Sequence, residues 1–283
     1  MLKVIKMDLF RMYKSKYTYI VLLAAILMMA ASVFMTKQDI DYYKQTPSAL
    51  ETLQRDGDEV NWGIYIGRVS PEWCTGEKIP LEELVAVNIK SKLLLMFLTA
   101  FIVLFAGNEI KSGFIKNIVG QTRHRRELVV GKLISIAVFT VVLLLTAVLT
   151  VMLGSAISFG YVYVKEAEKL AAYLGVECLL HIAYGSVVLL LVYLLRNMVV
   201  CMLAGILLAA GILQIVDAFL LSIIPHLKEI AGFSIMNYLS SGNVGLISIL
   251  SGGSVYLKAV IVAAVTLILA GGFSALIVEK KDI

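Results

Sequence analysis

Charged side chains are scarce in this chain of 283 residues: 16% are Asp, Glu, Lys or Arg, whereas 60% are hydrophobic. A soluble domain usually carries about 25% charged residues, so the composition excludes an ordinary soluble protein and points to lipid. Cysteines are also few. Cys74, Cys178 and Cys201 are too scattered for a disulfide framework, and we expect Cys74 to be a free thiol.

Motifs of catalysis and nucleotide binding are absent as well. The chain has no GxxxxGK[ST] phosphate loop, no HExxH, no CxxC and no GxSxG, and its three histidines lie in different regions. Its pattern also matches no nucleic-acid-binding module. We therefore expect this chain to be no enzyme and to hold no cofactor or metal of its own.

What the chain does contain is a series of apolar runs. A helix of about 20 residues crosses the hydrocarbon core of a bilayer. The expected spans are Tyr17 to Met35, Leu93 to Gly107, Leu133 to Leu153, Ala171 to Leu195, Met198 to Leu221 and Leu257 to Val278. The second is short unless its helix begins near Leu84, with Lys90 and Lys92 reaching the interface. These runs predict an all-α integral membrane protein with six transmembrane helices and both termini on one side.

Basic residues show which side that is. Five Lys or Arg residues lie in residues 1–16 and six in residues 108–132, whereas the segment 37–90 has ten acidic and six basic residues. Because basic residues in short loops stay in the cytoplasm, we expect both termini to be cytoplasmic and residues 37–90 to be extracellular. This arrangement predicts a multi-pass protein of the cell membrane, in bacteria the plasma membrane. The net charge of +5 then reflects topology and contact with anionic lipid, not nucleic acid.

Three segments outside the spans have recognisable patterns. Residues 1–16 carry apolar side chains at helical spacing, which predicts an amphipathic helix in the inner membrane interface. Residues 222–256 are apolar but broken by proline and glycine, so we expect short re-entrant helices between spans five and six, within the transmembrane domain of residues 17–283. The segment 37–90 is rich in turn residues, although its residues 61–69 could form a short strand.

The loop 108–132 has more structure than a retained cytoplasmic loop requires. From Glu109 to Val119, apolar residues recur at helical spacing, which predicts an amphipathic helix at the membrane surface. Gly120 fits the end of this helix, and Thr122 fits the start of the next. Cytoplasmic retention explains the positive charge of the loop, but it explains neither the helix nor the glycines.

These residues resemble the loop between spans two and three in permease subunits of type-2 ABC transporters. In that family a glutamate is followed by a Gly-Thr or Ser-Gly step, then a Ser-Arg or Thr-Arg pair, and then a Gly-Lys pair at the start of span three. The matching positions here are Glu109, Ser112, Gly113, Thr122, Arg123, Gly131 and Lys132. The layout of interfacial helix, six spans and broken apolar segment is similar too. Two departures are the extra basic residues after Arg123 and the length of the segment 37–90.

The resemblance implies a function for the loop. It would be a coupling helix that docks on a separate ABC ATPase subunit, and that subunit would bind ATP and Mg. The coupling residues would be Glu109, Gly113, Phe114, Lys116, Gly120, Thr122, Arg123, Arg125 and Lys132. The resemblance also implies a second permease copy, identical or different, and export of an amphipathic compound, a peptide or a drug.

Polar residues inside the spans offer another interpretation. Glu177 and His181 lie four residues apart on the fourth span and could share a proton or contact a substrate, as could Gln214 on the fifth span. We favour a structural role, with Glu177 near the outer interface and His181 bonded to a neighbouring helix, and we expect Asp217 to reach water. Two alternatives therefore remain: an ion- or proton-coupled carrier that works without an ATPase, and a membrane sensor that does not transport.

Overall fold

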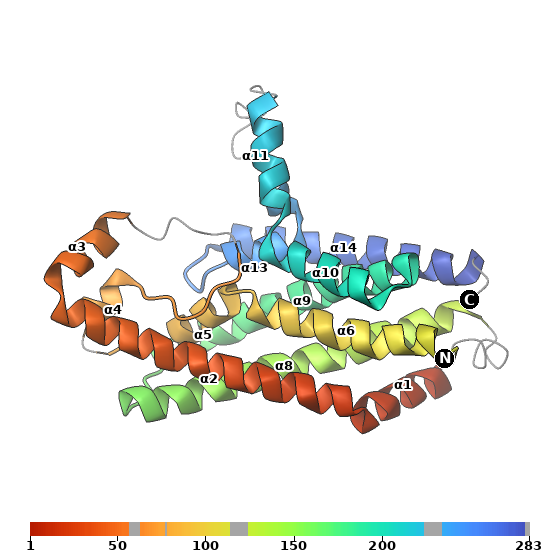
Figure 1. The fold of residues 1–283 in the computed structure, drawn as a ribbon, viewed down its shortest axis with the longest axis horizontal. Coiled ribbons are helices and arrows are strands. Elements are labelled where there is room, and N and C mark those ends of the chain that lie inside the picture. The colour runs from red at the N-terminus through yellow and green to blue at the C-terminus, as the bar shows by residue number, and fades with distance from the viewer. Residues whose placement is uncertain (57–62, 77, 114–123, 224–233, 281–283) are drawn as a thin grey trace.

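The computed structural model describes residues 1–56, 63–76, 78–113, 124–223 and 234–280. Within these residues all regular structure is helical, which confirms the all-α prediction. The strand considered for residues 61–69 is not found in its described part, because residues 63–70 form no regular element. The long helices run side by side along the longest axis of the molecule (Figure 1).

Long helices build the bundle, and shorter ones lie at its end or beside it. The long helices are α1 (Leu2–Lys14), α2 (Lys16–Gln45), α6 (Leu93–Lys111), α8 (Arg126–Phe159), α9 (Ala167–Leu195), α10 (Met198–Ala210) and α14 (Gly253–Lys280). The shorter elements are α3 (Pro47–Asp56), α4 (Pro71–Thr75), α5 (Leu81–Lys90), α11 (Leu213–Ile223), the 3-10 helix η1 (Ile235–Tyr238) and α13 (Ser240–Leu246).

Five described helices are long and apolar enough to cross a membrane: α2, α6, α8, α9 and α14. A sixth span exists only if α10 and α11 are counted together, and these two helices are bent by 57° at their junction. The chain is therefore a multi-pass membrane protein by the length and composition of its helices. At about 1.5 Å per residue, the 30 residues of α2 and the 34 residues of α8 both exceed the hydrocarbon core.

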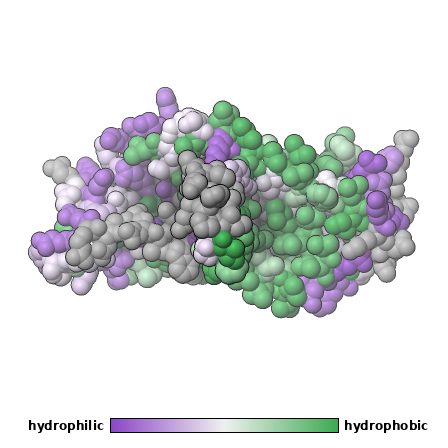
Figure 2. Space-filling model, turned by 90° about the horizontal axis from the view of Figure 1, so that it is seen from above, coloured by the Kyte–Doolittle hydropathy of each residue, from purple (hydrophilic) through white to green (hydrophobic). Residues whose placement is uncertain are grey.

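The two ends of the bundle differ. α1 and the last turn of α14 lie at one end, which we call the terminal end, whereas α3, α4 and α5 lie toward the other, the cap end (Figure 1). Figure 2 shows hydrophobic residues gathered between the two ends and hydrophilic residues at both of them. This is the surface pattern of a bundle whose middle faces lipid.

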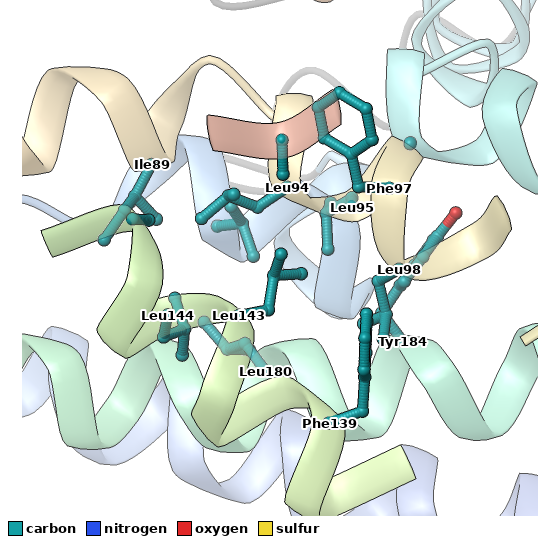
Figure 3. Packing of buried hydrophobic residues seen from close by; sticks show 14 of the residues in the cluster. Ile89, Leu94, Leu95, Phe97, Leu98, Phe139, Leu143, Leu144, Leu180 and Tyr184 are labelled. Atoms are coloured by element: carbon teal, nitrogen blue, oxygen red, sulfur yellow. The ribbon is translucent and has the colours of Figure 1, made fainter. Parts of the chain in front are cut away.

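Helix α6 is the central helix of the bundle, in contact with α2, α8, α9 and α10. Its Phe101 ring stacks on Phe139 of α8 with centroids 3.6 Å apart. Figure 3 shows Phe139 beside Leu98 and Tyr184, where α6, α8 and α9 meet. Tyr184 donates a hydrogen bond to the Gly205 carbonyl of α10 at 2.7 Å and lies 2.6 Å from the Thr99 hydroxyl of α6. Apolar packing and this polar contact together hold the centre of the bundle.

Local sequence explains the tight turn between α9 and α10. Arg196 ends α9 in the left-handed conformation, with φ of 52°. Asn197 then caps α10, because its side chain accepts hydrogen bonds from the backbone N–H groups of Val199 and Val200. The two helices can therefore reverse direction within two residues.

The cap end departs from expectation at Lys92. This residue separates α5 from α6 with φ of 61°, so the helix does not run unbroken from near Leu84. From the sequence we expected the side chain of Lys92 to reach the interface. It is instead 1% exposed and enclosed by protein. Burial lowers the pKa of its ammonium group, because the charged form loses its hydration.

Candidate functional site

The residues expected to couple to an ATPase fall into two groups. Five lie outside the described residues: Phe114, Lys116, Gly120, Thr122 and Arg123. Four are described: Glu109, Gly113, Arg125 and Lys132. All four described residues lie where α6 ends or α8 begins, at the terminal end.

Of the helix expected from Glu109 to Val119, only residues 109–113 are described, and they do not begin a separate helix. Helix α6 continues as far as Lys111, so Glu109 belongs to the end of a membrane helix. Gly113 then adopts φ of 67°, a left-handed conformation that ends helices and that glycine adopts at little steric cost. Glu109 is therefore held by the bundle and is not part of a separate surface helix.

Four charged side chains from α1, α6 and α8 meet at this end. The Nζ atom of Lys132 lies 2.6 Å from Oδ1 of Asp8 and 2.6 Å from Oε1 of Glu109. Nη1 of Arg11 lies 2.9 Å from the same Glu109 oxygen. We call Asp8, Arg11, Glu109 and Lys132 the terminal-end cluster. Asp8, Glu109 and Lys132 are each at most 4% exposed, and such burial is tolerable because two cations balance two carboxylates.

Two neighbouring residues shape the terminal-end cluster. At Gly131, an added Cβ would lie 2.6 Å from Oδ2 of Asp8 and 3.2 Å from Cγ1 of Val4, so the glycine is what allows α1 to approach α8. The Phe105 ring of α6 lies with its centroid 4.4 Å from Nζ of Lys132, within the range of a cation–π interaction. In the Gly131-Lys132 pair, the glycine admits α1 and the lysine binds it.

Sequence reasoning did not single out Asp8 or Arg11. The apolar face expected for residues 1–16 included Leu2, which is 72% exposed in the structure. The side of α1 that faces α8 carries Val4, Asp8 and Met12, each four residues from the next. The sequence did contain a signal for Asp8: it is an isolated acidic residue in a basic helix, and its spacing from Val4 and Met12 places its carboxylate on the packing face.

A second polar group lies inside the bundle on α9. Tyr173, Glu177 and His181 follow one another at four-residue spacing, and each is 0% exposed. Nδ1 of His181 lies 2.8 Å from the Glu177 carbonyl oxygen and 3.5 Å from Oε2 of the same residue. Within the described part of the chain, Oε1 of Glu177 and Nε2 of His181 have no hydrogen-bond partner.

This placement bears on the structural role that we favoured from the sequence. Glu177 is fully enclosed by protein, and His181 bonds to the carbonyl of its own helix instead of to a neighbouring helix. Buried ionisable groups in membrane bundles are costly and usually mark the path of a proton, an ion or a polar substrate. Glu177 and His181 therefore stay candidates for such a path.

A third polar group lies at the junction of α10 and α11. Gly211 ends α10 with φ of 83°, and α11 turns away from the bundle (Figure 1). Nζ of Lys92 and Oε1 of Gln214 each lie 3.7 Å from the position that a Gly211 Cβ would take. We expected Asp217 to reach water. Its side chain is instead 6% exposed and accepts a 2.5 Å hydrogen bond from Ser234.

Other kinds of site find little support. In the part of the chain that the structure describes, no three His, Cys, Asp or Glu side chains lie close enough together to hold a metal ion. Comparison with protein-family models and with curated proteins found no match. The terminal-end cluster, by contrast, is a polar group in which charged side chains of three helices contact one another.

Proposed function

We propose that this chain is the transmembrane subunit of an ATP-driven ABC exporter and receives its energy from a separate ATPase subunit through the loop between α6 and α8. The observation that carries this proposal is the terminal-end cluster. It ties Glu109, just before the loop, to Lys132, just after it, and ties both to Asp8 and Arg11 of α1. A loop that served only to join two spans would not need its flanking residues to be paired in this way.

The cluster makes the base of three helices mechanically continuous. Separating Lys132 from its carboxylates would leave buried charges unpaired, at a cost of about 3–5 kcal/mol. A force applied to the loop would therefore move α1, α6 and α8 together instead of pulling them apart. Phe105, Phe101 and Phe139 continue the contact into the core, with centroid separations of 5.3 and 3.6 Å. This is the rigid-body behaviour that alternating access requires.

The remaining parts of the proposal follow from the resemblance and the charge pattern. The terminal end would face the cytoplasm and the cap end the outside, in the plasma membrane of a bacterium. ATP and Mg would bind the partner ATPase. A second permease copy would complete the translocation path for an amphipathic compound, a peptide or a drug, and membrane lipid would cover the apolar flanks.

Affinity purification from native membranes tests the proposal. The tagged chain should bring down an ABC ATPase, and the variant Arg123→Glu with Arg125→Glu should lose it while still inserting in the membrane. Lys165→Glu with Lys169→Glu is the matched control, because it makes the same charge change at exposed positions near the cap end. Retention of the ATPase by the loop variant, or no ATPase with the unmodified chain, would overturn the assignment.

A proton-coupled carrier is the second candidate, favoured by the buried Glu177 and His181. Glu177→Gln keeps the shape of the side chain but removes its ability to ionise. In liposomes that contain this chain alone, the carrier hypothesis predicts transport driven by a proton gradient and loss of transport in Glu177→Gln. Absence of transport by the unmodified chain without an ATPase would favour the exporter.

A further inference from the structure

The cap end contains a pocket whose lining has a distinct chemical character. It lies where α2, α4 and the end of α8 meet, has a volume of about 130 Å³, and is lined in part by Lys37, Asp41, Lys44, Trp73, Phe159 and Tyr161. We call it the cap pocket. α2 and α8 both exceed the thickness of the hydrocarbon core, so their ends at the cap can project beyond the lipid.

Hydrogen bonds fix two of the aromatic walls. Nε1 of Trp73 donates to Oε2 of Glu83 at 2.8 Å, and the Tyr161 hydroxyl accepts from the backbone N–H of Ile79 at 3.0 Å. The Tyr161 carbonyl in turn accepts from the Ser155 hydroxyl at 3.0 Å. Walls held in this way are preformed, so a ligand would not have to order them on binding.

Two lysines and one carboxylate, Lys37, Lys44 and Asp41, line the cap pocket. Lys37 forms an ion pair with Asp41, and its Nζ lies 5.9 Å from the Phe159 centroid. Lys78 approaches the Tyr161 ring at the same distance. Lys44 lines the pocket, and among the described residues no carboxylate lies within 4 Å of its ammonium group. The pocket thus offers one cation that no described acid neutralises.

We propose that the cap pocket binds a small aromatic carboxylate or a similar ring-bearing anion. The ring would lie among Trp73, Phe159 and Tyr161, and the anionic group would pair with Lys44. Burial of a flat apolar ring and a charge-assisted contact would both contribute to binding. The volume of about 130 Å³ suits a single ring, since an apolar cavity of about 150 Å³ can bind benzene. This inference does not depend on the proposed exporter function.

Quenching of Trp73 fluorescence by an iodinated ligand tests the proposal. The chain has two tryptophans, so Trp62→Phe leaves Trp73 as the sole reporter in the full-length protein. 4-Iodobenzoate quenches by direct contact, and 4-iodobenzamide is a neutral probe of nearly the same shape. We expect saturable quenching by 4-iodobenzoate and about tenfold weaker binding of 4-iodobenzamide, as a hydrogen bond to a charged group implies.

Variants separate specific binding from partition into detergent. Lys44→Gln should weaken 4-iodobenzoate binding about tenfold, Lys44→Arg should retain it, and the exposed control Lys169→Gln should leave it unchanged. Size-exclusion chromatography verifies that each variant is folded. If Lys44→Gln does not fold, the comparison of 4-iodobenzoate with 4-iodobenzamide in Lys44→Arg still decides the test. Linear quenching without saturation, equal binding of the neutral probe, or an unchanged Lys44→Gln variant would overturn the proposal.

Discussion

Lys132 holds two carboxylates that have little access to water. In Lys132→Ala, Asp8 and Glu109 would stay buried without their shared cation, and breaking such a pair costs about 3–5 kcal/mol. We therefore expect a clearly lower thermal midpoint in detergent, followed by intrinsic fluorescence. Lys169→Ala is the control, because Lys169 pairs with Glu166 at the surface and exposed pairs contribute about 1 kcal/mol or less. Equal midpoints for the two variants would show that the cluster does not stabilise the fold.

Lys92 predicts how stability changes with pH. Burial lowers its pKa in the folded state below the ordinary value of 10.5, so the unfolded chain takes up the proton more readily. The sign follows from linkage: stability falls as the pH drops from about 10.5 toward the lowered pKa. Lys92→Met should raise the thermal midpoint at pH 7 and flatten its rise between pH 7 and pH 10. An exposed lysine changed in the same way, Lys165→Met, should alter neither, and a lower midpoint in Lys92→Met would contradict the expectation.

At the scale of elements, Gly131 controls how closely α1 approaches α8. Gly131→Ala would place a methyl group 2.6 Å from Asp8 Oδ2, which must shift and weaken its bond to Lys132. In Gly272→Ala on α14, the new methyl group meets no atom within 4 Å, and alanine favours a helix by about 1 kcal/mol over glycine. Thermal unfolding should show Gly131→Ala to be destabilised and Gly272→Ala unchanged or stabilised. The opposite order would mean that α1 does not pack against α8 as described.

The helices also show how much of the structure can be predicted from the sequence. Long apolar runs identify the membrane helices, because period and length are local properties. The break at Gly211 is not predictable in this way, since a single glycine in an apolar run is compatible with a continuous helix and its left-handed conformation depends on tertiary contacts.

The candidate site was predictable only in part. Glu109 and Lys132 could be selected because they flank one loop whose sequence resembles that of ABC permeases, and both lie in the cluster. Asp8 joins Lys132 across 124 positions, and no local rule pairs residues so far apart in sequence. Glu177 and His181 could be selected as polar residues within a span, but their complete burial depends on how the other helices cover α9.

At the scale of the whole molecule, the charge pattern predicts the orientation of the bundle. With the native cysteines replaced, a single cysteine at His124 should lie in the cytoplasm and one at Lys169 should lie outside. A membrane-impermeant maleimide added to intact cells should label the Lys169→Cys variant and should label the His124→Cys variant only after the cells are opened. The reverse labelling would place the α6–α8 loop on the outside and remove the basis for an ATPase contact there.

The central claim is that the loop between α6 and α8 receives energy from a separate ATPase. Photocrosslinking in native cells tests it most directly, with p-benzoylphenylalanine in place of His124, an exposed described residue just before α8. The same substitution at Lys169, near the cap end, is the control. The account predicts that the His124 position, and not the Lys169 position, is crosslinked to a protein carrying a GxxxxGK[ST] nucleotide-binding sequence. Crosslinks from the His124 position to lipid or to proteins without that sequence, and to no ATPase, would contradict it.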